Sequence, residues 1–504
     1  MRGIIGLCLA AGIAAGQQPS SPTAAPPVFH ATSELVQVNV VALDKHGKPV
    51  SDLKREEFQL FDNGVRQEIR VFAGRGENTA KVPPPELMAT NAFTNLIAPS
   101  AGPQSGYTVI LLDNLYSGSD PTNEEGSLLS RSRALEMLRS APAGEKIAIY
   151  APGIKFKVIC EFTTDRDLLD RELRKFKVMP STPASEPRPT LQAMLNPQAA
   201  AEAQSRAAAE MARVDALIQS DIGDFQLSAL ADHVAGVPGR KKLIWLANKF
   251  PVSPRALQDL NRAGVSIYPV DIDGVCRLCP ERPRQQMDEI AAMTGGVAYY
   301  GRNDLSAAML EAMDDGNVSY RLGFYPSVED DGTAPVHMLT VSVSRPGVRL
   351  RYGTTYQRAA LPVTVTPGDL GRAMNRPIDA TAIPVRASVV RVRDRLSLDA
   401  TVSLESLGLT QEQDRWTGHI EFAARFTTAD AIIASEPITR TVTLNLSQEK
   451  YDIAVRAGVT YHHDLQIPPK AVELKLLFAN PASGKIGTLT IPLARVKAGA
   501  ASPR

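Results

Sequence analysis

The sequence predicts a mixed α/β and β chain: a doubly wound, mostly parallel sheet, a small β-sandwich flanking it, and a C-terminal β-sandwich of immunoglobulin-like size. Residues 106–316 alternate continuous apolar runs with helix-like stretches, which is typical of a parallel sheet covered by helices on both faces. Residues 385–497 hold about seven short alternating segments separated by turns, and this pattern indicates a sandwich. Strand-like segments at 30–75 and 317–357 flank the α/β region, and we expect them to pair with each other.

The individual elements follow from local patterns. A strand at 34–43 alternates apolar and polar residues, and Asp62-Asn63-Gly64 predicts a hairpin because Asn-Gly supplies the positive φ angles of a tight turn. In the α/β region we expect strands at 107–112, 146–150, 156–159, 241–246 and 265–270 and helices at 124–139, 165–176, 199–235, 254–263 and 284–294.

These patterns divide the chain into nine parts. They are a signal peptide at 1–16, a linker at 17–29, an N-terminal β segment at 30–75, a connector at 76–105, the α/β domain at 106–316, a second β segment at 317–357, a linker at 358–384, the C-terminal sandwich at 385–497 and a tail at 498–504. The α/β domain is thus expected to be inserted into the small sandwich.

Composition narrows the function classes. Apolar residues make up 44% of the 504 residues and charged residues 22%, so the chain can build ordinary cores. Lys and Arg total 55 against 54 Asp and Glu, which gives a formal net charge of +1. A balance this close to zero argues against a nucleic-acid binder that depends on neutralising phosphates.

The N-terminus predicts export. Arg2 precedes an apolar run at 4–15, and small residues then lead to Gln17, as in a secretory signal peptide. The run is shorter than the roughly 20 apolar residues that span a bilayer, and no later segment reaches that length. We therefore expect a periplasmic, cell-surface or extracellular protein without an integral membrane span after signal removal. A buried N-terminal helix is the alternative interpretation.

Three cysteines remain after export. Cys276 and Cys279 form a Cys-x-x-Cys pair in a loop, for which a local disulfide is the leading interpretation. A zinc site would need a second ligand pair, and a thioredoxin-like motif would open a helix where Pro280 favours an extended loop. Cys160 is expected to be a buried thiol.

The first strand of the α/β region ends at a pattern suited to a cation. In an open parallel sheet, ligands bind beyond the carboxyl ends of the strands. Asp113 ends this strand and is followed four residues later by Ser117, and a carboxylate with nearby hydroxyls can hold a hard divalent cation. The spacing resembles the metal-ion-dependent adhesion site of von Willebrand factor A domains, Asp-x-Ser-x-Ser. Leu115 replaces the middle serine of that motif.

Further stretches extend the resemblance to roughly residues 30–357. The chain resembles bacterial exported VWFA-related proteins of the acidobacterial type in Phe162-Thr-Thr-Asp165 and in residues 35–72, 242–251, 264–271, 294–299, 319–326 and 348–352. In A domains that bind metal, an aspartate follows the fourth strand, whereas this sequence has Ala247-Asn248-Lys249 there. The resemblance therefore implies a degenerate site, at which Asp113 and Ser117 would hold Mg²⁺ or Ca²⁺.

The resemblance implies a non-enzymatic protein that binds a protein or cell-surface ligand through the rim of its α/β domain. The expected rim residues are Asn114, Tyr116, Ser119, Asp120, Asn248, Lys249, Asp271 and Asp273. The sequence contains no Gly-x-Ser-x-Gly, His-Glu-x-x-His, phosphate-loop or Gly-x-Gly-x-x-Gly motif, and no catalytic residue is assigned. Two alternatives stay open, a secreted hydrolase with an unrecognised active site and a structural or assembly component of the cell envelope.

Overall fold

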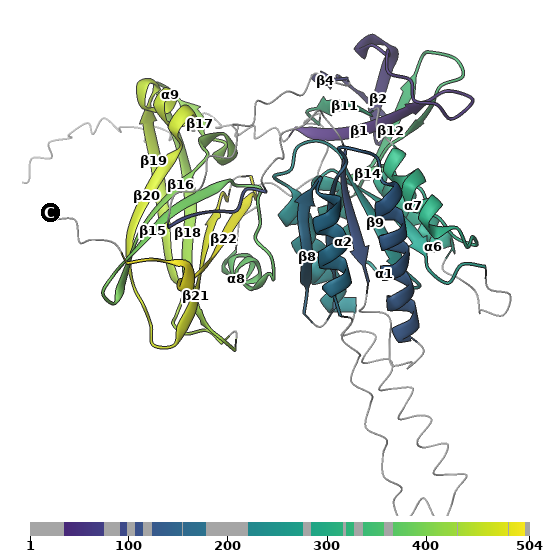
Figure 1. The fold of residues 1–504 in the computed structure, drawn as a ribbon. Coiled ribbons are helices and arrows are strands. Elements are labelled where there is room, and N and C mark those ends of the chain that lie inside the picture. The colour runs from purple at the N-terminus through teal and green to yellow at the C-terminus, as the bar shows by residue number, and fades with distance from the viewer. Residues whose placement is uncertain are drawn as a thin grey trace, which may run out of the picture. The chain divides into compact units, whose positions relative to one another are not determined.

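Five sheets and the helices around them form the described part of the chain (Figure 1). The computed structural model describes residues 35–74, 91–97, 106–113, 123–153, 155–177, 220–275, 284–315, 319–326, 336–356, 366–430, 432–481 and 483–498. The expected signal peptide at 1–16 and the linker at 17–29 lie outside these ranges. Among the described residues, no helix is both long and apolar enough to cross a membrane.

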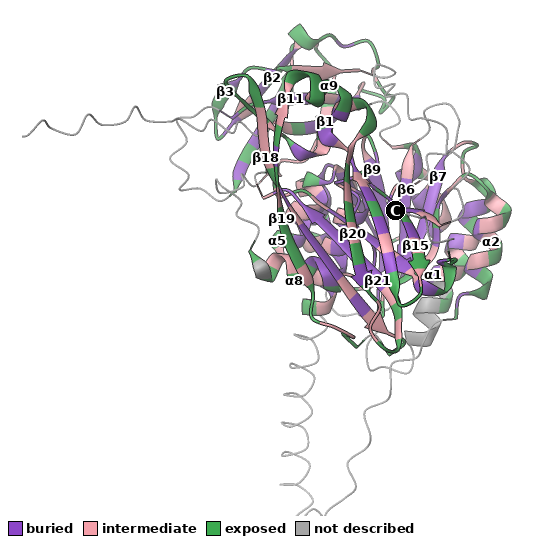
Figure 2. Cartoon of the chain, turned by 90° about the vertical axis from the view of Figure 1, so that its left-hand side faces the viewer, coloured by how far each residue is buried: buried purple, intermediate pink, exposed green. Residues whose placement is uncertain are grey.

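The central sheet has the strand order β10-β9-β6-β7-β8. Its strands are β6 (Tyr107–Leu112), β7 (Lys146–Ala151), β8 (Lys157–Thr163), β9 (Lys241–Ala247) and β10 (Val265–Asp271). The first four in this order are parallel, and β8 pairs with β7 in the antiparallel direction. Every residue of β7, β9 and β10 is buried, as their continuous apolar sequences predict for strands covered on both faces (Figure 2).

Helices pack on both faces of this sheet. One face packs against α1 (Asn123–Ser140), α2 (Arg166–Lys175) and α7 (Leu305–Asp314). The other face packs against the helical residues 220–234, α5 (Pro254–Arg262) and α6 (Arg284–Thr294). The helix α7 was not predicted, although its buried Leu305, Ala308, Met309 and Ala312 follow helical spacing.

Two small sheets enclose a separate core. One has the order β13-β1-β11-β4 and the other β14-β12-β2-β3. Their strands are β1 (Val36–Leu43), β2 (Phe58–Asp62), β3 (Val65–Gln67), β4 (Val71–Ala73), β11 (Ser319–Phe324), β12 (His337–Val343), β13 (Arg349–Arg351) and β14 (Thr355–Tyr356). β1 pairs with β11, and β2 pairs with β12, so the two β segments that flank the α/β region are hydrogen-bonded to each other. Asn63 and Gly64 have φ angles of 46° and 81° in the hairpin turn between β2 and β3.

The C-terminal region contains two more sheets that share one core. One has the order β20-β16-β15-β5, and the other has the order β17-β18-β21-β22 with β19 also paired to β18. Their strands are β5 (Ala92–Thr94), β15 (Val385–Val392), β16 (Arg395–Val402), β17 (Thr410–Glu412), β18 (Arg415–Thr428), β19 (Ile438–Ser447), β20 (Val459–Gln466), β21 (Ala471–Ala479) and β22 (Ile486–Pro492). The prediction of a mixed α/β and β chain is confirmed at this level.

Two stretches expected to be connectors contain regular structure. β5 lies within the expected connector 76–105 and adds a strand to the C-terminal sandwich by pairing with β15. The helix α8 (Pro367–Asn375) lies within the expected linker 358–384, where Thr366 and Asp369 form a capping box and Pro367 occupies the first turn. One further helix that was not predicted, α9 (Gln448–Ala457), follows β19.

Candidate functional site

Three parallel strands end side by side in the central sheet. Leu112 of β6 pairs with Leu246 of β9, and Ala247 pairs with Asp271 of β10. Asp113, which follows Leu112, therefore lies in the same row as Ala247 and Asp271. Because neighbouring strands are about 4.8 Å apart, the backbones of the two aspartates are separated by roughly 10 Å, with β9 between them.

The Asp113 carboxylate is buried and held by a tryptophan. Asp113 is 5% exposed, and its Oδ2 accepts a hydrogen bond of 2.8 Å from Nε1 of Trp245. Trp245 pairs in register with Leu111, two residues before Asp113, and side chains two residues apart on a strand share a face. Phe250 packs edge-on against the indole with ring centroids 5.2 Å apart. The sheet geometry thus fixes the orientation of this carboxylate.

Asp271 begins a tight turn at the end of β10. It is 4% exposed, and its Oδ1 accepts a hydrogen bond of 3.0 Å from the backbone N–H of Asp273. Gly274 has a φ of 64°, and Asn303 Oδ1 accepts from the N–H of Val275 at 2.8 Å. The Asp271 carboxylate therefore helps to shape the turn, while Asp273 is exposed.

The structure describes only part of the expected rim. Asp113, Asn248, Lys249, Asp271 and Asp273 are described, with Asn248 half-buried and Lys249 exposed. The rim residues Asn114, Tyr116, Ser119 and Asp120, the metal candidate Ser117 and the disulfide candidates Cys276 and Cys279 lie outside the described residues. Among these described residues, no three His, Cys, Asp or Glu side chains form a group that could hold a metal ion. The described residues therefore do not by themselves make a complete shell for Mg²⁺ or Ca²⁺.

A second polar cluster connects β8 with the helical residues 220–234 and with the segment before β15. Nδ1 of His233 lies 2.7 Å from the backbone oxygen of Asp379, so this nitrogen donates a proton. Nε2 of His233 lies 3.2 and 3.3 Å from the two carboxylate oxygens of Glu161. The hydroxyl of Tyr150 also donates to Glu161, at 2.8 Å. An imidazolium with both nitrogens protonated can donate to the Asp379 carbonyl and to the Glu161 carboxylate at the same time.

The ionisation of this pair follows from its neighbours. Burial alone would lower the pKa of His233, but the hydrogen bond and the charge of Glu161 raise it, and the Asp379 carbonyl adds to this effect. For Glu161 burial opposes ionisation, yet the contacts with His233 and the Tyr150 hydroxyl lower its pKa. Both shifts therefore favour the ion-paired form of His233 and Glu161.

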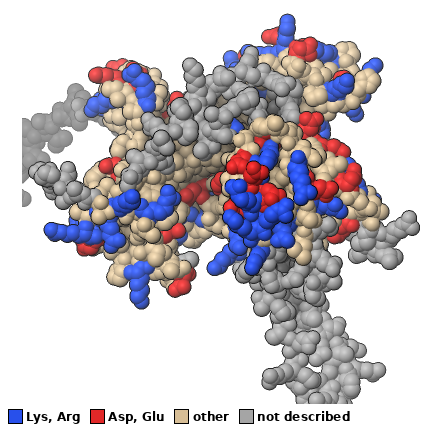
Figure 3. Space-filling view, in the orientation of Figure 1, with Lys and Arg blue, Asp and Glu red and all other residues tan. Residues whose placement is uncertain are grey.

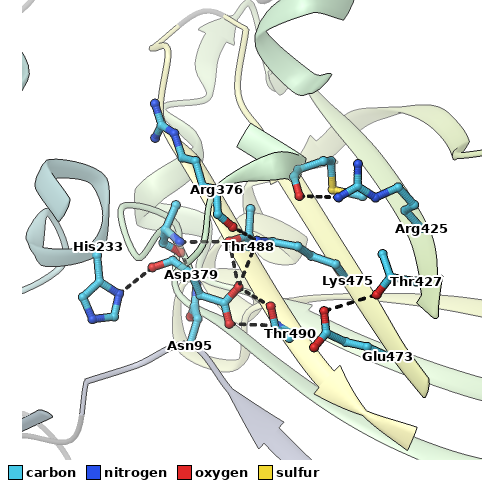
Figure 4. A network of polar contacts seen from close by, with 12 residues as sticks. Asn95, His233, Arg376, Asp379, Arg425, Thr427, Glu473, Lys475, Thr488 and Thr490 are labelled. Carbon is cyan, nitrogen blue, oxygen red and sulfur yellow. Dashed lines mark hydrogen bonds and ion pairs between the residues drawn. The ribbon is translucent and has the colours of Figure 1, made fainter. Parts of the chain in front are cut away.

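Asp379 is held by the C-terminal sandwich (Figure 4). Its Oδ1 accepts hydrogen bonds from the hydroxyls of Thr488 and Thr490 at 3.0 and 2.8 Å, and its Oδ2 accepts from the N–H of Thr490 at 2.8 Å. Nζ of the buried Lys475 lies 3.9 Å from Oδ1. Sequence analysis missed this cluster because its members are far apart in the chain and match no motif.

Surface charges are mixed on the face drawn in Figure 3. Lys and Arg side chains gather over β8 and α2, and Asp and Glu side chains lie beside them. On α2, Arg174 pairs with Asp170 at 2.6 Å and Lys175 pairs with Glu172 at 2.7 Å. These exposed pairs balance one another, so this face does not present a field of a single sign.

No protein-family model and no curated protein matches the chain. Parts of the chain are similar to solved structures. One is an aerotolerance-related membrane protein from Bacteroides fragilis, at 12% identity over 41% of this chain and 96% of that chain, with a TM-score of 0.24. Another is BatB from Bacteroides thetaiotaomicron, at 10% identity over 41% and 96% of the two chains, with a TM-score of 0.25. A third is proximal thread matrix protein 1 from the mussel byssus, at 11% identity over 42% and 47%, with a TM-score of 0.26. Similarity at this level assigns neither a family nor a function.

Proposed function

We propose that this chain is an exported, non-enzymatic protein with a von Willebrand factor A-like domain that binds a protein or cell-surface ligand. The binding surface would be the rim at the carboxyl ends of β6, β9 and β10. The observation that carries the proposal is the row of three parallel strand ends, in which Trp245 orients the carboxylate of Asp113. Open parallel sheets bind their ligands at this edge.

The exposed rim residues offer a direct test. Lys249 and Asp273 are exposed, so the double variant Lys249→Ala/Asp273→Ala should fold normally. A matched control is Glu449→Ala/Lys450→Ala on α9, which removes one exposed charge of each sign elsewhere. In a pull-down from envelope extracts, we expect one stoichiometric partner that the rim variant loses and the control variant retains. Equal recovery by both variants would refute the rim as the binding surface.

Metal dependence is a separate part of the proposal. We expect Asp113 and Ser117 to hold Mg²⁺ or Ca²⁺, with the remaining ligands supplied by water or by a carboxylate of the partner. Asp113→Asn keeps an oxygen that can accept from Trp245 while removing the charge that a cation needs. Calorimetric titration with Mg²⁺, Ca²⁺ and Mn²⁺ should give heat with the wild type and none with this variant. Identical traces would exclude the metal site and leave the rim proposal to the pull-down.

A hydrolase is the second candidate, and the Glu161–His233 cluster is the observation that favours it. The two side chains line a pocket, and catalytic sites commonly combine a carboxylate and an imidazole in this way. The hydroxyls of the described lining threonines are already engaged, since Thr94 donates to the Val385 carbonyl and Thr490 donates to Asp379. Hydrolysis of a panel of esters and glycosides, abolished by Glu161→Gln, would replace the binding proposal with this one.

A further inference from the structure

A pocket of about 410 Å³ lies next to the Glu161–His233 pair. Four parts of the chain line it: the residues after β5, the end of β8, the helical residues around His233, and the sandwich residues near Asp379. Leu96, Ile97, Phe162, Pro377 and Ile378 give it apolar walls. Its volume lies within the range of small-molecule sites, which are about 300–1,000 Å³ and mostly apolar with a few polar groups.

The charged groups that line this pocket favour a cation. Glu161 and Asp379 contribute two carboxylates, His233 contributes one imidazolium, and neither Lys nor Arg is among the described lining residues. The Asp379 carboxylate is occupied by three donors from Thr488 and Thr490. The available acceptor is therefore Glu161, whose side chain is 46% exposed. Its carboxylate accepts from Tyr150 and His233, and a carboxylate has about four acceptor sites in all.

We propose that this pocket binds a small organic cation, with an ammonium or guanidinium group hydrogen-bonded to Glu161 and an apolar body against Leu96, Ile97 and Phe162. The site does not depend on the rim of the central sheet. The cation is either a free amine or a lysine or arginine side chain of a partner, since both present the same chemistry. Charge-assisted hydrogen bonds of this kind are stronger than neutral ones, and the apolar walls add the burial of the ligand body.

The protonation state of His233 should change the affinity of the pocket for the cation. The groups that face its ring are Glu161 on β8, Tyr150 on β7, whose ring lies edge-on at 5.8 Å, and the carbonyl of Asp379. The neighbouring Asp232 on the same helix pairs with Arg376. When His233 loses its proton at higher pH, the lining keeps the negative charges of Glu161 and Asp379, and the nearest cation is Lys475, whose Nζ lies 3.9 Å from Asp379 and not beside Glu161. A cation should therefore bind more tightly above the raised pKa of His233 than below it.

Titration of the full chain with benzylammonium, followed by saturation-transfer NMR, tests the proposal. Benzyl alcohol and benzoate serve as the neutral and anionic counterparts. We expect saturable binding of benzylammonium that strengthens from pH 6 to pH 8.5, and weaker or no binding of the other two. Glu161→Gln keeps an acceptor for Tyr150 but removes the charge, and it should weaken binding at least about tenfold. The exposed Glu449→Gln is the matched control and should leave binding unchanged.

A second variant covers the case in which Glu161→Gln fails to fold. Leu96→Trp fills the pocket from a half-buried position and leaves the Glu161–His233 pair intact, so it should abolish binding. If Gly-Lys-Gly competes with benzylammonium, the natural cation is a side chain of a partner. If benzylammonium binds and Gly-Lys-Gly does not compete, the natural cation is a free amine. Equal binding of benzyl alcohol, unchanged binding by both pocket variants, or the absence of saturable binding would overturn the proposal.

Discussion

Lys241 is 3% exposed, so its charge is buried. Replacement of this lysine by methionine is therefore expected to stabilise the protein at pH 6. Lys241 is the first residue of β9, and its Nζ donates one hydrogen bond, of 2.8 Å, to the carbonyl of Val237. No carboxylate among the described residues forms an ion pair with it. Burial, with a smaller contribution from the charge of Arg321, lowers the pKa of Lys241 to about 7.

The magnitude follows from this shift. An unfolded lysine keeps its proton up to pH 10.5, whereas the folded one releases it near pH 7, so the unfolded state binds more protons between these values and stability rises with pH. At about 1.4 kcal/mol per pH unit, the buried lysine costs about 5 kcal/mol below pH 7. Methionine removes this penalty and loses one hydrogen bond worth about 1 kcal/mol. The expected gain at pH 6 is therefore about 4 kcal/mol, and it should shrink as the pH rises above 7.

The neighbouring lysine provides the matched control. Lys242 is equally buried, but its Nζ lies 3.2 Å from the buried carboxylate of Glu145, which also accepts from Thr108 at 2.5 Å. Lys242→Met would leave the Glu145 charge buried without its cation. Breaking a buried pair in this way typically costs about 3–5 kcal/mol. Adjacent substitutions of the same chemistry should thus change stability in opposite directions.

Urea unfolding at pH 6, 7, 8 and 9 measures both effects. The chain has two tryptophans, and Trp245 lies in β9 itself, so its fluorescence reports on the sheet that carries both lysines. We expect the midpoint of Lys241→Met to lie above that of the wild type at pH 6 and to approach it at pH 9. A lower midpoint at pH 6, or a wild-type pH dependence that persists in the variant, would refute this account of the buried charge.

Three further predictions concern other buried polar groups. Trp245→Phe removes the N–H donor of the Asp113 carboxylate and should lower stability by about 1–3 kcal/mol, as measured by thermal unfolding. The ion pair of His233 and Glu161 should stabilise the fold between the ordinary pKa values of 4.5 and 6.5, because the pKa of the acid is lowered and that of the histidine is raised. His233→Gln should therefore lower the melting temperature most at pH 5–6 and least at pH 9, and equal losses at both would contradict this. Asn95→Ala removes three hydrogen bonds to residues 380–385 and should speed amide exchange and proteolysis around β5; unchanged rates would contradict the role of Asn95.

The elements that sequence predicted well are those specified by local patterns. The runs that became β6, β7, β9 and β10 are mostly apolar and lack a regular polar alternation, which is typical of a strand covered on both faces. The hairpin turn at Asn63-Gly64 requires positive φ angles at both positions, and Asn and Gly are the residues that adopt such angles most readily. In these cases the sequence of neighbouring residues is enough to predict the strand or the turn.

Several features that depend on distant partners were not predicted, although the pairing of the two β segments around the α/β region was. β5 has three residues and pairs with β15, almost 300 positions later in the chain, so its sequence shows no alternation long enough to recognise. The Glu161–His233 contact joins residues 72 positions apart. The link between Trp245 and Asp113 needed the register of β6 against β9, which sequence alone does not give. The sequence signal that could have indicated this contact was a tryptophan among the apolar residues 243–247 of β9.

The net charge of the chain is close to zero, but its buried charged side chains have very different surroundings. Lys241 forms no ion pair with a carboxylate in the described part of the chain, and burial lowers its pKa, whereas Lys242 pairs with the buried Glu145. At the other end of the sheet, Asp113 is buried against an indole N–H, which orients the carboxylate without neutralising it. A carboxylate whose orientation is fixed in this way is suited to meet a cation or a basic group of a partner. This is the physical reason to look for function at the strand ends, where charge is oriented, and not on the mixed outer surface, where opposite charges already balance.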